Sequence, residues 1–177
     1  IDLKKNGKEI LEEWLLSLIK RKLISRLGIS IYSITDLNSI CLDNYGLIQM
    51  PISLYDQRLL KNKNYEKILK QNISIYARSI FFQGLLLVNS DKWPSSISRK
   101  FKLHHNKFLH SLNKESRIEI CLKFINSCKF IDSSLIGITC LDELKEVVNI
   151  NKKIKLINES FSEYGWNFDS DLDPRLW

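Results

Sequence analysis

The chain has 177 residues, and its 27 Lys and Arg against 20 Asp and Glu give a formal charge of +7 at neutral pH. Its 44% hydrophobic and 27% charged residues are typical of a globular protein and exclude a disordered tail, a collagen-like repeat and a disulfide miniprotein. The longest apolar run, Ile80 to Val88, is interrupted by Gln83 and Gly84 and is far shorter than the roughly 20 residues that cross a bilayer. We therefore expect one domain over residues 1–177 and no membrane span.

The chain start and the cysteines indicate a cytoplasmic fragment. The sequence begins at Ile1, has no basic leader with a small-residue cleavage site, and leads directly into a charged helical pattern, which predicts a piece of a longer polypeptide. The four cysteines form no CxxC pair, and Cys121 and Cys128 are seven residues apart on one expected helix face. This spacing favours reduced, buried thiols over a disulfide framework or a zinc site.

Hydrophobic periodicity predicts a leading helix followed by four strand–helix units. Apolar residues recur every 3.6 residues over 7–21, which indicates an amphipathic helix. Runs rich in β-branched residues predict strands over 23–32, over 46–53, from 73 to a break at Gln83 and Gly84, and over 133–139. Helices are expected over 35–42, behind an N-cap signal at Thr35 and Asp36, and over 65–71, 99–110, 114–128 and 141–152.

Apolar strands that alternate with helices predict an α/β fold with a parallel sheet covered by helices. A doubly wound sheet and part of a barrel both satisfy this pattern. A complete eight-unit barrel takes about 250 residues, so four units and a leading helix fit half of one.

In either architecture ligands bind beyond the carboxyl ends of the strands, where each predicted strand delivers polar groups. These are Ser30, Gln49, Arg78 with Ser79, and Gly137 to Thr139. Ser and Gln both donate and accept hydrogen bonds, as an amide-bearing ring requires, and Gly137 ahead of a helix offers backbone N–H groups to an anion. Each residue alone is also explained as a solvated loop residue, whereas four strands with such ends favour a ligand site.

Four segments carry a family resemblance. The succession "RLGISIY", "LIQMPISLYDQRL", "ARSIFFQGLLL" and "SSLIGITCLDELKEVV" resembles the last four strand–helix units of the aldo-keto reductases, in order and spacing. "RSIFFQGLLL" is similar to bacterial members associated with sugar or polysaccharide metabolism. The resemblance implies the second half of a TIM barrel, with about four strands and five or more helices, and a nicotinamide dinucleotide as partner.

The resemblance implies coenzyme contacts for ten residues. Ser30 and Gln49 match positions that bind the nicotinamide carboxamide, although Ile31 replaces the Asn that commonly follows the Ser. Arg78 matches an aromatic position that stacks on the nicotinamide ring, and its positive charge favours the reduced, neutral ring. The matches along the pyrophosphate, the ribose and the adenosine are Ser79, Phe81, Gln83, Gly84, Gly137, Thr139 and Glu143.

By this resemblance the coenzyme is NADP or NAD, and Glu143 favours NAD. Many NADPH-preferring members carry Lys or Arg facing the 2′-phosphate and an Asn one turn later, where this chain has Gly137, Glu143 and Val147. A carboxylate repels a phosphate and accepts from a ribose hydroxyl. Glu143 is equally explained as a solvated helix residue.

The resemblance also implies a catalytic Asp–Tyr–Lys–His tetrad, in which Tyr protonates the carbonyl oxygen as hydride arrives. The tetrad belongs to the first half of the barrel, so we expect no catalytic residue in this chain. The full-length protein is then expected to reduce an aldehyde or ketone, with a sugar-derived carbonyl as one candidate.

Other chemistry has weaker support in the sequence. His104, His105 and His110 are not spaced to place two imidazoles on one helical face, so no metal site is expected. The cluster of Asp56 and Arg58 around Gln57 fits a turn ion pair better than a substrate contact. Packing is the expected role of Tyr32, Tyr55 and Tyr76 and of Trp166 and Trp177 in the tail.

Two alternatives of another class remain. Lys61, Lys63, Lys67 and Lys70 are close in sequence, but no nucleic-acid-binding motif accompanies them, so no nucleic-acid partner is expected. A non-catalytic half-barrel that binds or assembles is the stronger alternative, because four strands leave two unpaired edges that favour self-association.

Overall fold

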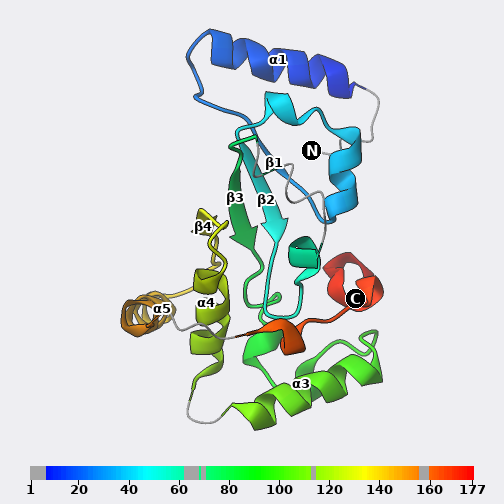
Figure 1. Cartoon of the computed structure of the whole chain (residues 1–177), viewed down its shortest axis with the longest axis vertical. Helices are drawn as coiled ribbons and strands as arrows, with labels where there is room; N and C mark the ends of the chain where they lie inside the picture. The colour runs from blue at the N-terminus through cyan, green and yellow to red at the C-terminus, as the bar shows by residue number, and fades with distance from the viewer. Residues whose placement is uncertain (1–6, 62–67, 69–70, 113–114, 156–159) are drawn as a thin grey trace.

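The computed structural model describes residues 7–61, 68, 71–112, 115–155 and 160–177, and one parallel sheet lies at its centre (Figure 1). The strands are β1 (Gly28–Ser30), β2 (Leu47–Pro51), β3 (Ser74–Arg78) and β4 (Ser133–Ser134). They are parallel and lie in the order β1-β2-β3-β4. A doubly wound sheet reverses its strand order at a switch point, whereas the described strands keep the sequential order of a barrel.

Side chains alternate between the two faces of the sheet because successive residues of a strand point to opposite sides. One face is buried in the core: Ile29, Ile48, Met50, Ile75 and Ala77. The opposite face carries Gln49, Tyr76 and Arg78, which are partly exposed. Burial of each large apolar side chain contributes about 1.5–3 kcal/mol, so this alternation fixes which residues face the open side.

The helices surround the sheet on several sides. In Figure 1, α1 lies beyond the amino ends of the strands, α3 crosses beyond their carboxyl ends, and α4 and α5 lie together on the β4 side. Ser98 and Ser116 cap α3 and α4 by accepting hydrogen bonds from backbone N–H groups. The α-helices are α1 (Lys8–Lys20), α3 (Arg99–Ser111), α4 (Arg117–Ser127), α5 (Leu141–Lys153) and α6 (Asp169–Leu172), and the 3₁₀ helices are η1 (Ile34–Ser39), η2 (Leu42–Asn44), η3 (Arg58–Lys61), η4 (Leu85–Leu87), η5 (Ser90–Lys92), η6 (Ser162–Tyr164) and η7 (Pro174–Leu176).

Two strands are shorter than the sequence predicts. The expected strand over 23–32 pairs with β2 only from Gly28, which lies opposite Leu47. The expected strand over 133–139 is confined to Ser133 and Ser134, which pair with β3. The apolar residues that follow β4 line a groove instead of extending the ladder, and Leu135 and Ile138 are exposed there, so their composition predicted both burial and pairing wrongly.

The predicted helix over 35–42 is replaced by η1 and η2. Its N-cap is Ser33 rather than Thr35 or Asp36. Ser33 and Asp36 form a capping box, in which the side chain of each residue accepts a hydrogen bond from the backbone N–H of the other. The carboxylate of Asp36 accepts from the N–H of Ser33 at 3.0 Å. The helix expected over 65–71 lies mostly outside the described residues.

The cysteine prediction is correct in part. All four thiols are free; Cys121 and Cys128 are buried as expected, whereas Cys41 and Cys140 are exposed. Burial raises the pKa of Cys121 to about 12 and that of Cys128 to about 11, so both remain protonated at neutral pH. None of the helices in the described part of the chain is long and apolar enough to span a membrane.

An aromatic core lies between α3 and the segment that follows β2. Tyr55 packs edge-on against Phe82, Phe101 and Phe108 at centroid distances of 5.8, 5.1 and 5.9 Å. Its hydroxyl lies 2.5 Å from Nδ1 of His105, whose Nε2 lies 2.8 Å from the carbonyl oxygen of Val88. A carbonyl only accepts, so the proton is on Nε2 and Tyr55 donates to Nδ1. Burial lowers the pKa of His105 to about 4, which keeps the imidazole neutral.

This neutral His105 should make the free energy of unfolding fall as the pH is lowered from 6.5 towards about 4. The folded pKa lies below the ordinary value, so the unfolded state takes up the proton first, and the stabilisation is complete only above pH 6.5. The variant His105→Gln does not titrate. It should reduce the slope of the free energy of unfolding against pH by up to about 1.4 kcal/mol per pH unit, as measured by urea unfolding. The exposed His110 of the same helix supplies the control His110→Gln, and an equal slope in wild type and His105→Gln would contradict the assignment.

Candidate functional site

A groove of about 740 Å³ runs from the carboxyl ends of β2 and β3 to the first turns of α5. Its walls are the turn over residues 78–84 and the loop over residues 135–139, and Ile118 of α4 also lines it. Four separate segments of sequence therefore meet in one place: the end of β2, the turn after β3, α4, and the loop that leads into α5. Nine of the ten residues predicted at the coenzyme line this groove: Gln49, Arg78, Ser79, Phe81, Gln83, Gly84, Gly137, Thr139 and Glu143.

Ser30 is the predicted residue that does not line the groove. It is exposed at the end of β1, and its Cα pairs with that of Gln49 in the parallel register. Ser30 thus lies one strand beyond the groove, at the same carboxyl end of the sheet. Its contact with a ligand stays a prediction.

Arg78 and Gln49 form the end of the groove at the sheet. Nη2 of Arg78 donates to the carbonyl oxygen of Ile31 at 3.0 Å, and its guanidinium carbon lies 4.4 Å from the ring centroid of Tyr32. Nε of Arg78 is buried and has no hydrogen-bond partner among the described residues. Burial lowers the pKa of Arg78, but a guanidinium stays charged at neutral pH. This end therefore presents a permanent positive charge beside an amide.

The turn after β3 has a strained backbone. Ser79, Phe82, Gln83 and Gly84 have φ values of 56°, 51°, 54° and 83°, in the left-handed region. For residues other than Gly this conformation costs of order 1 kcal/mol or more each, and such strain is concentrated at functional sites. The N–H of Phe82 donates to the carbonyl of Ser79 at 2.7 Å, and Nε2 of Gln83 donates to Oγ of Ser79 at 3.1 Å. Turns that contain left-handed residues form concave backbone surfaces suited to anions.

The opposite end of the groove is acidic. The carboxylate of Glu143, in the first turn of α5, accepts from N–H and Oγ1 of Thr139 at 2.7 and 2.9 Å. These hydrogen bonds lower the pKa of Glu143, so the group is ionised at neutral pH. Glu146 lines the same end one helical turn later. Glu143 therefore both closes the loop before its helix and brings negative charge to the groove.

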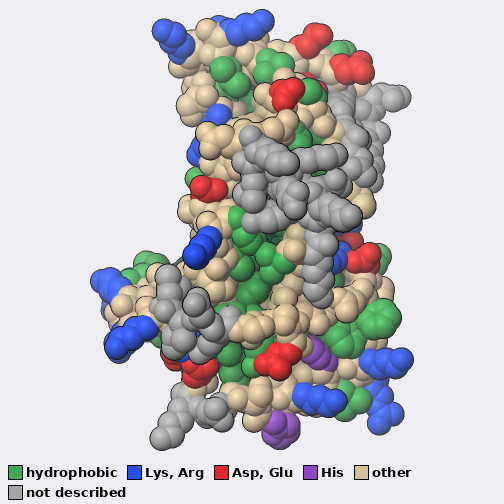
Figure 2. Space-filling model, viewed as in Figure 1, with side chains coloured by type: hydrophobic (Ala, Val, Ile, Leu, Met, Phe, Trp, Pro, Cys, Tyr) green, Lys and Arg blue, Asp and Glu red, His purple; other side chains and the backbone are tan. Residues whose placement is uncertain are grey.

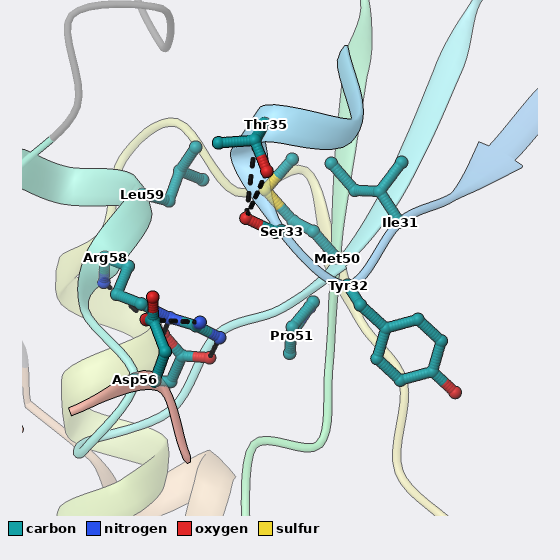
Figure 3. A pocket seen from close by; sticks show the side chains of 10 residues that line it. Ile31, Tyr32, Ser33, Thr35, Met50, Pro51, Asp56, Arg58 and Leu59 are labelled. Atoms are coloured by element: carbon teal, nitrogen blue, oxygen red, sulfur yellow. Dashed lines mark hydrogen bonds and ion pairs between the residues drawn. The ribbon is translucent and has the colours of Figure 1, made fainter. Parts of the chain in front are cut away.

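A second, smaller cavity of about 260 Å³ lies beside the ends of β1 and β2 (Figure 3). Its polar rim is bonded internally: Nε and Nη2 of Arg58 donate to Asp56 at 2.8 and 2.7 Å, and Oγ1 of Thr35 donates to Oγ of Ser33 at 2.9 Å. Burial alone would lower the pKa of Arg58, but the hydrogen bonds and charge of Asp56 raise it. The predicted turn ion pair is confirmed, and the ring of Tyr32 points away from it (Figure 3).

The other candidate residues have packing roles. His104 and His105 each bond a backbone carbonyl, and no three His, Cys, Asp or Glu side chains come together as metal ligands within the described ranges. Tyr55 is fully buried, and Trp166 stacks on Phe101 at 4.8 Å with an interplanar angle of 13°. The packing predicted for Tyr55 and Trp166 is confirmed.

The positive charge is dispersed on the visible face of the molecule. In Figure 2 the Lys and Arg side chains lie at separate places and alternate with Asp and Glu, while hydrophobic side chains gather near the middle. The predicted lysine cluster over 61–70 falls on residues whose side chains are not described. The face that Figure 2 shows therefore has no continuous basic track among its described side chains.

Comparison with known proteins relates the fold to one family. No model of a protein family matches the sequence, and neither does any curated protein. Among solved structures, aldo-keto reductase AKR11C1 from Bacillus halodurans matches in its apo form with a TM-score of 0.70 and 18% identity, over 91% of this chain and 57% of that chain. Its holo form matches with a TM-score of 0.67 and 19% identity, over 86% and 53%. The fold is that of about half an aldo-keto reductase barrel. This chain spans just over half the length of those structures.

The likeness to aldo-keto reductases agrees with the fold that the sequence predicted. The groove, however, contains residues that the sequence analysis did not predict. Glu146 lies three positions after Glu143 on α5, so helical spacing was a usable signal for it. The remaining missed residues are apolar and line the groove through tertiary packing, which no local sequence pattern indicates: Ile80, Leu87, Ile118, Leu135 and Ile136.

Proposed function

We propose that this chain is the coenzyme-binding half of a nicotinamide-dependent oxidoreductase of the aldo-keto reductase type, with NADH preferred over NADPH. The observation that supports this proposal most is that nine of the ten residues implied by the resemblance line a single groove at the carboxyl ends of parallel strands. The amide of Gln49 suits a carboxamide, the turn over residues 79–84 suits a pyrophosphate, and the acidic end suits ribose hydroxyls. An elongated dinucleotide combines these groups in this order.

The substrate and the reaction belong to the complete enzyme in this proposal. Reduction of an aldehyde or ketone needs a proton donor at the carbonyl oxygen, and we assign that role to no residue of this chain. A sugar-derived carbonyl is the candidate substrate, on the resemblance of "RSIFFQGLLL". A cytoplasmic setting is part of the proposal, and the four free cysteines support it.

Binding of NADH tests the proposal directly. We expect the nicotinamide fluorescence of NADH to change saturably on titration with the chain. Gln49→Ala and Arg78→Ala should each weaken the affinity by about tenfold, the effect of losing one charged or bidentate contact. The exposed Arg21 at the end of α1 supplies the control Arg21→Ala. Equal affinity for NADH in the wild type and both groove variants would refute the position of the nicotinamide ring beside Gln49 and Arg78.

Coenzyme preference should depend on the two carboxylates of the acidic end. Repulsion between the 2′-phosphate of NADPH and Glu143 with Glu146 predicts tighter binding of NADH, by about tenfold. The double variant Glu143→Gln, Glu146→Gln should reduce this ratio towards one, with a larger effect at low salt. Lys153 at the far end of α5 supplies a charge-changing control, Lys153→Gln. Tighter binding of NADPH by the wild type would contradict the preference.

One observation favours the second candidate, a half-barrel that assembles. Gly28 and Ser30 of β1 are exposed, and among the described strands β1 has only β2 as a neighbour. The outer side of β1 therefore leaves backbone groups without a strand partner among the described residues, and such an edge can pair with a second chain.

Light scattering over a range of chain concentrations tests this candidate. Assembly through the sheet edges predicts a mass that rises to that of a dimer. The N–H of Ile31 donates to Gln49 of β2, so in the alternating parallel ladder the N–H of Ser30 points to the free edge. Replacing Ser30 by Pro removes this backbone donor and should shift the equilibrium towards monomer. A monomer mass at every concentration would exclude assembly.

A further inference from the structure

The groove end at the sheet is connected to the C-terminal segment through one aromatic ring. The guanidinium carbon of Arg78 lies 4.4 Å from the ring centroid of Tyr32, and that of Arg175 lies 4.2 Å from the same centroid. Tyr32 follows β1, Arg78 ends β3, and Arg175 belongs to η7. Three distant segments of the chain therefore meet at this ring.

Arg175 is held in place by its own neighbours. Its Nε and Nη2 donate to Asp173 at 2.8 and 2.5 Å, and its backbone N–H donates to the same carboxylate at 3.0 Å. Pro174 between the two residues fixes the backbone at the start of η7. This guanidinium is therefore preorganised beside Tyr32 rather than free to sample many rotamers.

The C-terminal segment is itself anchored to the core and to the groove turn. The buried carboxylate of Asp171 accepts from N–H and Oγ of Ser98 at 2.9 and 2.7 Å. The ring of Trp177 lies 5.1 Å from that of Phe82, and its Nε1 donates to the carbonyl of Asp171 at 3.1 Å. Residues 171–177 thus pack against the same turn that walls the groove.

Arg78 needs such support because its own bonds do not fix it. Among the described residues its guanidinium donates one hydrogen bond, to the carbonyl of Ile31, and its buried Nε has no partner there. A long side chain with one bond has rotamer freedom to lose on binding, whereas stacking on an aromatic face restricts it beforehand. The ring of Tyr32 supplies that face.

We infer that Tyr32, supported by Arg175, is a positioning residue that holds the guanidinium of Arg78 at the nicotinamide end of the groove. The inference rests on the proposed function and adds to it a link between the C-terminal segment and affinity for the nicotinamide ring. Tyr32 acts through Arg78, so the loss of Tyr32 should weaken the binding only of ligands that carry the nicotinamide ring. ADP-ribose, which lacks the ring, is the matched probe.

A double-mutant comparison tests the inference. Tyr32→Ala should weaken NADH binding by about as much as Arg78→Ala, roughly tenfold, and the double variant should be no weaker than Arg78→Ala alone. Tyr32→Phe keeps the ring and should stay within about twofold of wild type. Arg175→Ala should give a smaller loss in the same direction. Affinity for ADP-ribose should be unchanged in Tyr32→Ala, Tyr32→Phe and Arg175→Ala, which also shows that these variants are folded.

The outcomes separate the inference from the proposed function. Wild-type chain that binds neither NADH nor ADP-ribose would overturn both. Binding of NADH that Arg78→Ala weakens and Tyr32→Ala leaves unchanged would overturn the inference alone. Additive losses in the double variant, or equal losses for NADH and ADP-ribose, would show that Tyr32 contributes general stability and would likewise overturn it.

Discussion

Parallel pairing of four strands in sequence order is the constraint on which the rest of the molecule depends. It brings every strand's carboxyl end to one edge of the sheet, so the segments after the strands must gather there. The two-residue period then decides which side chains reach the open face: Ile48 and Ile75 enter the core, while Gln49 and Arg78 stay accessible. A one-residue slip in β2 or β3 would bury an amide or a guanidinium and expose an isoleucine.

The groove has a graded chemical character along its length. One end carries the cation of Arg78 beside the amide of Gln49, the middle is the strained turn after β3, and the far end carries Glu143 and Glu146. Strain at Ser79, Phe82 and Gln83 is maintained because the aromatic core and the C-terminal segment pack on Phe82 from outside the groove. The aromatic core therefore stabilises the turn that lines the groove as well as the fold.

The sequence predicted the repeating features well and the contacts between distant segments poorly. Helix α1, α3, α5 and the central strands followed from hydrophobic period, because burial of one face dictates that period. The first and last strands were overestimated because β-branched composition is a local feature, whereas a strand needs a neighbouring strand to pair with. At the site, resemblance supplied nine groove-lining residues, but neither the stack of Tyr32 with Arg175 nor the contribution of Ile118 has any local signature.

Hydrogen exchange of the whole chain, measured with and without NADH, tests the central claim most directly. A dinucleotide that lies along the groove must slow amide exchange in two distant segments at once, residues 79–87 and residues 137–147. The segments beside the smaller cavity, residues 33–36 and 56–59, should exchange at the same rate in both states. Protection confined to that cavity, or no protection in either groove segment at saturating NADH, would contradict the account.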